Sequence, residues 1–181
     1  MINCLNINLD IKPLREELDI NSYGTTEYTR VKLNDINHEL ISFLSTLNLT
    51  ISWAVVFYTA PFGFTGIHVD IDNNNKSNDY VKLNYIFGGR NSVMCWWKQK
   101  DNVSSTLLRT VAGSGYMPFE IHQVDLIDEQ QVKFPSIVQV GIPHNIKNFE
   151  EPRYCLSLVL KKRYRTRLTM AESIELFKQY L

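Results

Sequence analysis

The 181-residue chain has few cysteines, no long apolar run and no excess of charge of either sign. Its three cysteines, Cys4, Cys95 and Cys155, are widely spaced and form no Cys-x-x-Cys pair. A disulfide framework or a zinc knuckle is therefore not expected, whereas a reducing compartment such as the cytoplasm is. The apolar runs are far shorter than the ~20 residues that cross a membrane, and the N-terminus lacks the pattern of a signal peptide. Neither a membrane protein nor a secreted one is expected.

Charge is balanced, with 19 Lys and Arg against 19 Asp and Glu. This balance excludes a globally basic nucleic-acid coat and an acidic solvating tail. Basic residues are nevertheless dense in the segment 161–167. That segment is either a solvated strand exit or a local contact with an anionic partner such as nucleic acid. A Gly-rich phosphate loop is lacking, since Gly113-Ser-Gly115 does not join a strand to a helix.

The chain does have enough apolar and aromatic residues for a packed core, and their periodicity predicts the elements that form it. A helix is predicted over about 35–47, capped by Asn34 or Asp35, and another over 169–181 after a Thr169-Met-Ala-Glu172 capping box. Between the helices, alternating or β-branched runs predict these strands: 51–58, 81–87, 92–98, 136–142 and 154–160.

This order predicts a mainly β (α+β) fold, a sandwich or barrel with flanking helices. We expect a single domain over 1–181. It would consist of an N-terminal buttress over 1–50, a β core over about 51–160 and the C-terminal helix over 169–181.

His68 and Asp70 are the first candidates for chemistry. On a strand, two residues that are two positions apart point to the same face. An imidazole and a carboxylate held side by side supply two of the three ligands of a facial metal triad. A His-x-Asp pair is common by chance, so a third ligand must come from elsewhere in the chain. The other histidines of the first half and of the middle, His38 and His122, fit ordinary surface positions.

His144 and Arg153 complete the pattern. His144 follows the predicted strand over 136–142, and Arg153 comes nine positions later, at the start of the last predicted strand. The alternation of that strand places Arg153, Cys155 and Ser157 on one face. A guanidinium at the start of an apolar strand needs an anionic partner if it is buried, and its planar fork suits a carboxylate. A surface arginine at a strand end remains the alternative.

The order His-x-Asp, long β-rich interval, His and then Arg resembles the Fe(II)- and 2-oxoglutarate-dependent dioxygenases, in particular small 2-oxoglutarate oxygenase-like proteins of phages. The resemblance covers roughly 53–160. It implies a double-stranded β-helix, which is a jelly-roll or cupin-like barrel. It also implies that His68, Asp70 and His144 bind Fe(II), and that Arg153 binds the distal carboxylate of 2-oxoglutarate.

The same resemblance implies an oxygenase that uses O₂ and hydroxylates a C–H bond while 2-oxoglutarate is decarboxylated to succinate. Asn84, on a strand expected to face the interior, would hydrogen-bond the cosubstrate or a metal ligand. Ser157 or Tyr58 would offer Arg153 a hydroxyl partner, and Trp96 would pack over the site. The substrate would be a small molecule, a protein side chain or a nucleic-acid component, and a viral chain would act in the host cytoplasm.

Departures from the family leave other functions open. DNA-repair members with a similar Arg-Tyr-x-Leu strand carry a second arginine six residues later, where this chain has Val159. One alternative is therefore a non-catalytic member of the same fold, serving as a viral structural or binding protein. A cupin-like metal isomerase or binding protein is another, although it would have no need of Arg153. The polar run 72–79 beside the His-x-Asp pair is a candidate lid.

Overall fold

Two antiparallel six-stranded sheets make up most of the chain. The computed structural model describes residues 2–71, 79–110, 115–132, 135–162 and 166–181. The first sheet has, in spatial order, β1 (Cys4–Asn6), β10 (Ser136–Gln139), β5 (Val81–Gly88), β12 (Arg153–Lys162), β3 (Leu49–Thr59) and β2 (Tyr28–Arg30). The second has β7 (Leu108–Arg109), β8 (Gly115–Phe119), β4 (Ile67–Ile71), β11 (His144–Lys147), β6 (Val93–Gln99) and β9 (Val124–Gln130).

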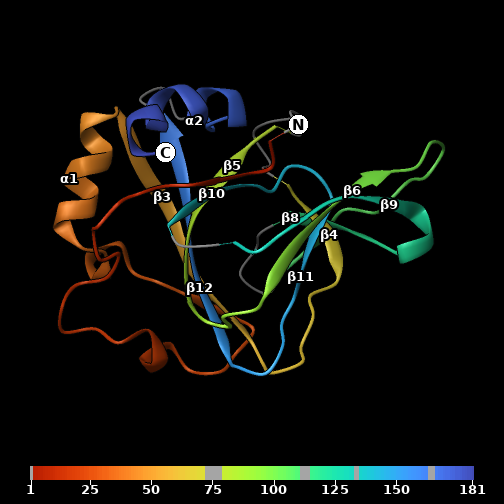
Figure 1. Ribbon diagram of the computed structural model, residues 1–181, viewed down its shortest axis with the longest axis horizontal. Helices are drawn as coiled ribbons and strands as arrows, with labels where there is room; N and C mark the ends of the chain where they lie inside the picture. The colour runs from red at the N-terminus through yellow and green to blue at the C-terminus, as the bar shows by residue number, and fades with distance from the viewer. Residues whose placement is uncertain (1, 72–78, 111–114, 133–134, 163–165) are drawn as a thin grey trace.

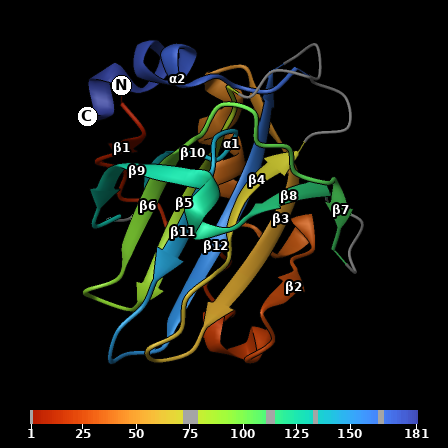
Figure 2. The ribbon, with the colours of Figure 1, turned by 90° about the vertical axis from the view of Figure 1, so that its right-hand side faces the viewer.

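The chain passes back and forth between the two sheets. β3, β5, β10 and β12 lie in the first sheet, and β4, β6, β9 and β11 lie in the second (Figure 2). The order β10-β5-β12-β3 therefore faces the order β9-β6-β11-β4, with few strands adjacent in space to their neighbours in sequence. This topology is consistent with a jelly roll. The predicted β-rich core is confirmed as two antiparallel sheets, and its predicted strands lie within one to three residues of those observed.

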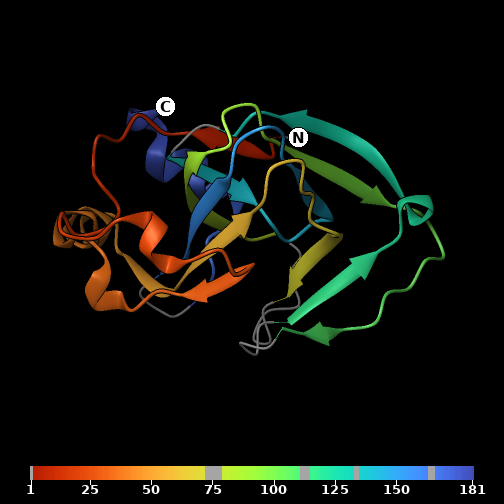
Figure 3. The same ribbon diagram turned by 90° about the horizontal axis from the view of Figure 1, so that it is seen from below.

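The two α-helices of the described residues cover the first sheet. α1 (His38–Thr46) and α2 (Met170–Phe177) pack on its outer face, where Leu40, Leu44 and Phe177 join one hydrophobic cluster with residues of β5 and β12 (Figure 1). The view from below shows α1 on the side of the molecule away from β7 and β8 (Figure 3). The start of the chain instead reaches β9, where Asn3 Nδ2 donates to Asp128 Oδ2 at 3.0 Å. Short 3₁₀ helices also occur, at η1 (Ile20–Tyr23), η2 (Leu33–Asp35), η3 (Ile121–Gln123) and η4 (Lys178–Tyr180).

The start of the C-terminal helix is predicted correctly, whereas that of the N-terminal helix is not. Thr169 and Glu172 form the predicted capping box at the start of α2. The N-terminal helix instead begins three residues later than predicted, because Asn34 and Asp35 belong to η2 and Ile36 is extended. Asn37 is the actual cap, and its side chain accepts a hydrogen bond from the Glu39 amide.

Residues of β12 alternate between two apolar regions. Leu156, Leu158 and Leu160 belong to the helix-side cluster. Cys155 belongs instead to a second cluster between the sheets, together with Trp96 of β6. The register of β12 with β3 and β5 then determines which residues of those two strands also point between the sheets, on the inward face of the first sheet. Arg153 and Ser157 share that inward face, as the strand alternation predicts.

A tight double-glycine turn holds the start of β12. Gly88 and Gly89 both have positive φ, of 66° and 56°. A Cβ at Gly89 would lie 2.6 Å from the Cβ of Arg153, and a Cβ at Gly88 would lie 2.3 Å from the Pro152 carbonyl oxygen. The turn therefore needs glycine both for its backbone angles and for its close approach to β12.

Gly89→Ala is accordingly expected to destabilise the fold by about 3 kcal/mol, from left-handed strain of about 1 kcal/mol plus displacement of Arg153. Gly24→Ala is the matched control, since Gly24 has φ 77° but has nothing within 4 Å of an added Cβ. Gly24→Ala should lower the free energy of unfolding only by the backbone strain of about 1 kcal/mol. Urea unfolding of the three proteins measures both effects, and equal losses in the two variants would contradict the contact with Arg153.

Two predicted features fall on residues outside those described. The candidate lid over 72–79 lies there apart from Asp79, and so does the middle of the basic segment 161–167. The three cysteines are free. Within the described ranges, no helix has the length and apolar character needed to cross a membrane.

Candidate metal centre

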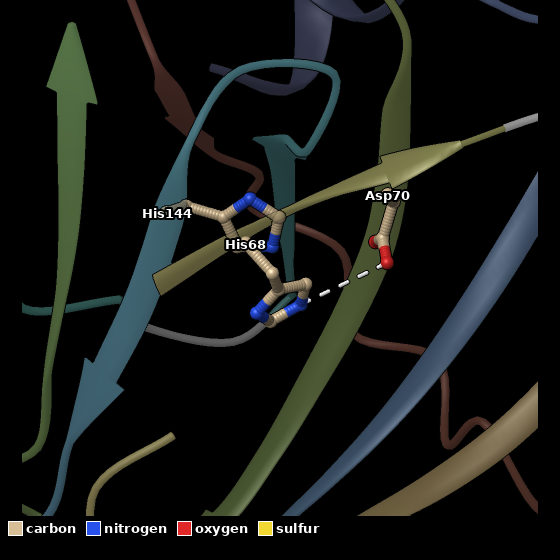
Figure 4. Close-up of side chains that lie close together, drawn as sticks. All are labelled: His68, Asp70 and His144. Atoms are coloured by element: carbon tan, nitrogen blue, oxygen red, sulfur yellow. Dashed lines mark ion pairs between the residues drawn. The ribbon is translucent and has the colours of Figure 1, made fainter. Parts of the chain in front are cut away.

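Two neighbouring strands of the second sheet bring His68, Asp70 and His144 together. β4 and β11 are antiparallel, and His68 lies directly opposite His144. Asp70 lies two residues after His68 and therefore on the same face. One potential ligand atom from each of the three residues lies within 4.8 Å of the other two. The two imidazoles lie side by side with ring centroids 4.6 Å apart, and Asp70 Oδ1 is 3.8 Å from His68 Nε2 (Figure 4).

Backbone carbonyls orient both imidazoles in the same way. His68 Nδ1 is 2.8 Å from the Gly66 carbonyl oxygen, and His144 Nδ1 is 2.9 Å from that of Ile142. A carbonyl oxygen only accepts, so Nδ1 carries the proton in each ring and donates it. In a neutral imidazole this leaves the lone pair on Nε2, the atom then available to a metal. In each case the carbonyl two residues before the histidine orients the ring so that Nε2 is free to bind a metal.

The charges within the site favour the ligating forms of His144 and Asp70. Burial of His144, reinforced by the neighbouring His68, lowers its pKa to about 3, so the imidazole is neutral at pH 7. Burial alone would raise the pKa of Asp70. The ammonium of Lys82, 2.6 Å from Oδ2, and the two imidazoles outweigh that effect and hold the pKa below its usual range. The carboxylate is therefore ionised, as metal ligation requires.

The depressed pKa of His144 predicts acid sensitivity of the metal-free protein. Unfolding releases His144 to take up a proton near its ordinary pKa of about 6.5, whereas the folded protein resists protonation down to about 3. The unfolded state thus binds more protons in this window, and stability falls as the pH falls. The expected contribution is a loss of about 2 kcal/mol between pH 6.5 and pH 5.

Urea unfolding at pH 6.5 and at pH 5, in the presence of a chelator, measures this loss. His144→Gln is the test variant and His38→Gln is the control. His38 is exposed on α1. The His144 variant should show a shallower pH dependence, and the His38 variant should follow the wild type. Identical slopes in all three proteins would contradict the assignment.

Arg153 is a buried cation with a neutral partner. It begins β12 with 3% exposure, and its Nε donates to Ser92 Oγ at 3.1 Å. Among the residues that the structure describes, no carboxylate lies within ion-pair distance of its guanidinium. Burial lowers its pKa from the ordinary value, which is the desolvation cost of an uncompensated charge. A buried guanidinium of this kind is suited to receive an anionic ligand.

Asn84 and Ser157 form a polar pair on the inward face of the first sheet. They are cross-strand partners on β5 and β12, with exposures of 7% and 1%. Asn84 Oδ1 is buried without a hydrogen-bond partner. A buried acceptor without a partner is costly, so this oxygen is available to a hydrogen-bond donor of a ligand. Trp96 is the cross-strand neighbour of His144 and is fully buried, with Nε1 donating to the Gln139 carbonyl.

Tyr58 does not join these residues. It lies opposite Tyr154, with ring centroids 5.1 Å apart, and β12 directs Tyr154 toward the helix-side cluster. The inward residue opposite Arg153 is instead Thr59. Of the two hydroxyl partners suggested for Arg153, Tyr58 is therefore on the other side of the sheet, whereas Ser157 shares the inward face. The hydroxyl that contacts the guanidinium is that of Ser92.

Sequence reasoning missed Lys82, whose ammonium contacts Asp70 from the opposite sheet. A signal was present, because Lys82 is two positions before Asn84 on the same strand and shares its inward face. Ser92 was missed as well, and nothing in its local sequence distinguishes it from other turn residues.

The two histidines and one carboxylate, which come from two adjacent strands, are the residue types of the facial triad that holds a metal ion and leaves coordination positions open.

No protein-family model and no curated protein matches the chain. Among solved structures it is similar to an oxalate oxidase in complex with the substrate analogue glycolate, at a TM-score of 0.34 and 11% identity. That similarity covers 91% of this chain and 64% of the neighbour, and it is too weak to indicate an activity.

Proposed function

We propose that this chain is a metal-dependent oxygenase with a double-stranded β-helix fold, which uses Fe(II), 2-oxoglutarate and O₂ to hydroxylate a C–H bond. The observation that supports it best is the pairing of a two-histidine, one-carboxylate cluster with a buried arginine that has no acidic partner among the described residues. The first feature suits a divalent cation with open positions, and the second suits the carboxylate of a cosubstrate.

The residues present fit an iron ion. His68 and His144 would each offer Nε2, and Asp70 would offer a carboxylate oxygen, a mixed set typical of non-haem Fe(II) oxygenases. Bound iron would supply the activation of O₂, coupled to decarboxylation of 2-oxoglutarate to succinate. The protein's contribution is to hold and orient the reactants and to keep water away from them.

Residues on three strands would hold the cosubstrate and exclude water. Arg153 would hold the distal carboxylate of 2-oxoglutarate through its guanidinium fork, which the contact with Ser92 orients. Asn84 and Ser157 would hydrogen-bond the cosubstrate from the facing sheet. Trp96, beside His144, would exclude water from that side of the site.

The test is an anaerobic titration of the purified protein, first with Fe(II) and then with 2-oxoglutarate. Chelation of the oxoacid by bound iron gives a weak visible charge-transfer band, and we expect this band to saturate with 2-oxoglutarate in the wild type. His68→Ala is the negative control because it removes a ligand. Metal binding without a band at any concentration of 2-oxoglutarate would reject the oxygenase and favour a cupin-like metal protein. Absence of metal binding would reject the site altogether.

A further inference from the structure

Lys82 is a largely shielded cation that lies beside the proposed metal site. It projects from the inward face of β5, and its Nζ donates to Asp70 Oδ2 at 2.6 Å. The exposed fractions of the two side chains are only 12% and 19%. Nζ also lies 5.8 Å from the ring centroid of Phe57, on the same inward face. Lys82 and Asp70 therefore form an ion pair that bridges the two sheets.

The two carboxylate oxygens of Asp70 have different neighbours. Oδ2 accepts from Lys82, whereas Oδ1 is the oxygen that faces His68 Nε2. A carboxylate held in this way has one oxygen available to a metal, because the other is occupied by a charge-assisted hydrogen bond. Binding through both oxygens would require the ion pair to break.

The ammonium also changes the charge of the ligand set. Two neutral imidazoles and one carboxylate carry a charge of minus one, and Lys82 brings the total to zero. Repulsion between the ammonium and a metal ion is proportional to the charge of the ion, so a trivalent ion is repelled more strongly than a divalent one. Because the pair is mostly shielded from water, this repulsion is screened only in part.

From these contacts we propose that Lys82 is a positioning residue that restricts Asp70 to one-oxygen ligation and acts as a fixed positive charge, which weakens cation binding and favours the divalent over the trivalent state of bound iron. This proposal rests on the metal site of the proposed function. It predicts an unusual outcome, since removing a residue that contacts a ligand should strengthen metal binding.

The experiment compares Lys82→Met and Lys82→Gln with Lys82→Arg. Gln can still donate a hydrogen bond to Asp70 but has no charge, whereas Arg keeps both. We expect the two uncharged variants to bind Mn(II) about tenfold more tightly than the wild type, measured by titration followed by electron paramagnetic resonance. The Arg variant should stay within about twofold of the wild type. In a mediated redox titration under argon, iron bound to the uncharged variants should have a lower reduction potential than iron bound to the wild type.

A merely structural role for Lys82 gives a different result. The uncharged variants would then bind Mn(II) more weakly, and the potential would not change, which would overturn the proposal. If Lys82→Met prevents folding, Lys82→Gln still decides between the two outcomes. If the wild type itself binds neither Mn(II) nor iron, the proposed function fails. If it binds both and the uncharged variants are indistinguishable from it, only the role of Lys82 fails.

Discussion

Arg153→Met is expected to weaken binding of 2-oxoglutarate strongly while binding of the metal ion persists. Methionine fills a similar volume but cannot pair with a carboxylate. Loss of one partner from a buried charge pair costs about 3–5 kcal/mol, so the affinity for 2-oxoglutarate should fall by about 10²–10⁴-fold. The three candidate metal ligands belong to the other sheet, so divalent-cation affinity should change by less than about threefold.

The measurement is the charge-transfer titration, with the affinity for Fe(II) determined separately in each protein. Arg30→Met is the matched control. Arg30 also belongs to the first sheet, where its guanidinium stacks at 4.0 Å on the ring of Trp53. That variant should keep wild-type affinity for 2-oxoglutarate. Arg153→Lys, which keeps the charge without the planar fork, should give an intermediate loss. Wild-type affinity in Arg153→Met would remove Arg153 from the site.

Loss of a single imidazole should have the largest effect on the metal. His144→Gln removes one of three ligands but preserves much of the volume of a residue that is only 5% exposed. We expect divalent-cation affinity to fall by at least about 10³-fold, since even outer-shell partners of metal ligands contribute 10–100-fold. The stabilisation by metal, seen as a rise of the melting temperature with added Mn(II), should disappear with it.

The chain provides its own controls for this experiment. His38 on α1 and His122 in η3 are exposed and lie outside the ligand cluster. His38→Gln and His122→Gln should keep the full metal affinity and the full rise in melting temperature. A loss of affinity in either control, or its retention in His144→Gln, would show that the cation binds elsewhere.

The parts of the site that could be predicted from sequence are those that depend on one strand at a time. Alternation alone places His68 with Asp70, and it places Arg153 with Ser157, since side chains repeat every second residue. Asn84 faces inward for the same reason. His144 could be predicted as a partner only through the family resemblance, because its distance from His68 depends on the pairing of β4 with β11.

The parts that could not be predicted depend on register between strands. Tyr58 and Thr59 are adjacent in sequence, and a shift of one residue decides which of them lies opposite Arg153. Alternation places Lys82 on the inward face of β5, but its contact with Asp70 crosses from one sheet to the other, and no pattern within one strand encodes that contact. The edge strands β7 and β9 escaped prediction because their residues are mostly exposed and β9 is rich in charge, so that periodicity is weak.

The support of both imidazoles by main-chain carbonyls has a consequence for how the site can change in evolution. A side chain that orients a metal ligand can be lost by one substitution, whereas the carbonyls of Gly66 and Ile142 are present whatever residues occupy those positions. The orientation of His68 and His144 is thus robust to sequence drift as long as the strand starts keep their path. Most of the residues around the candidate site can then change while His68, Asp70 and His144 keep their positions.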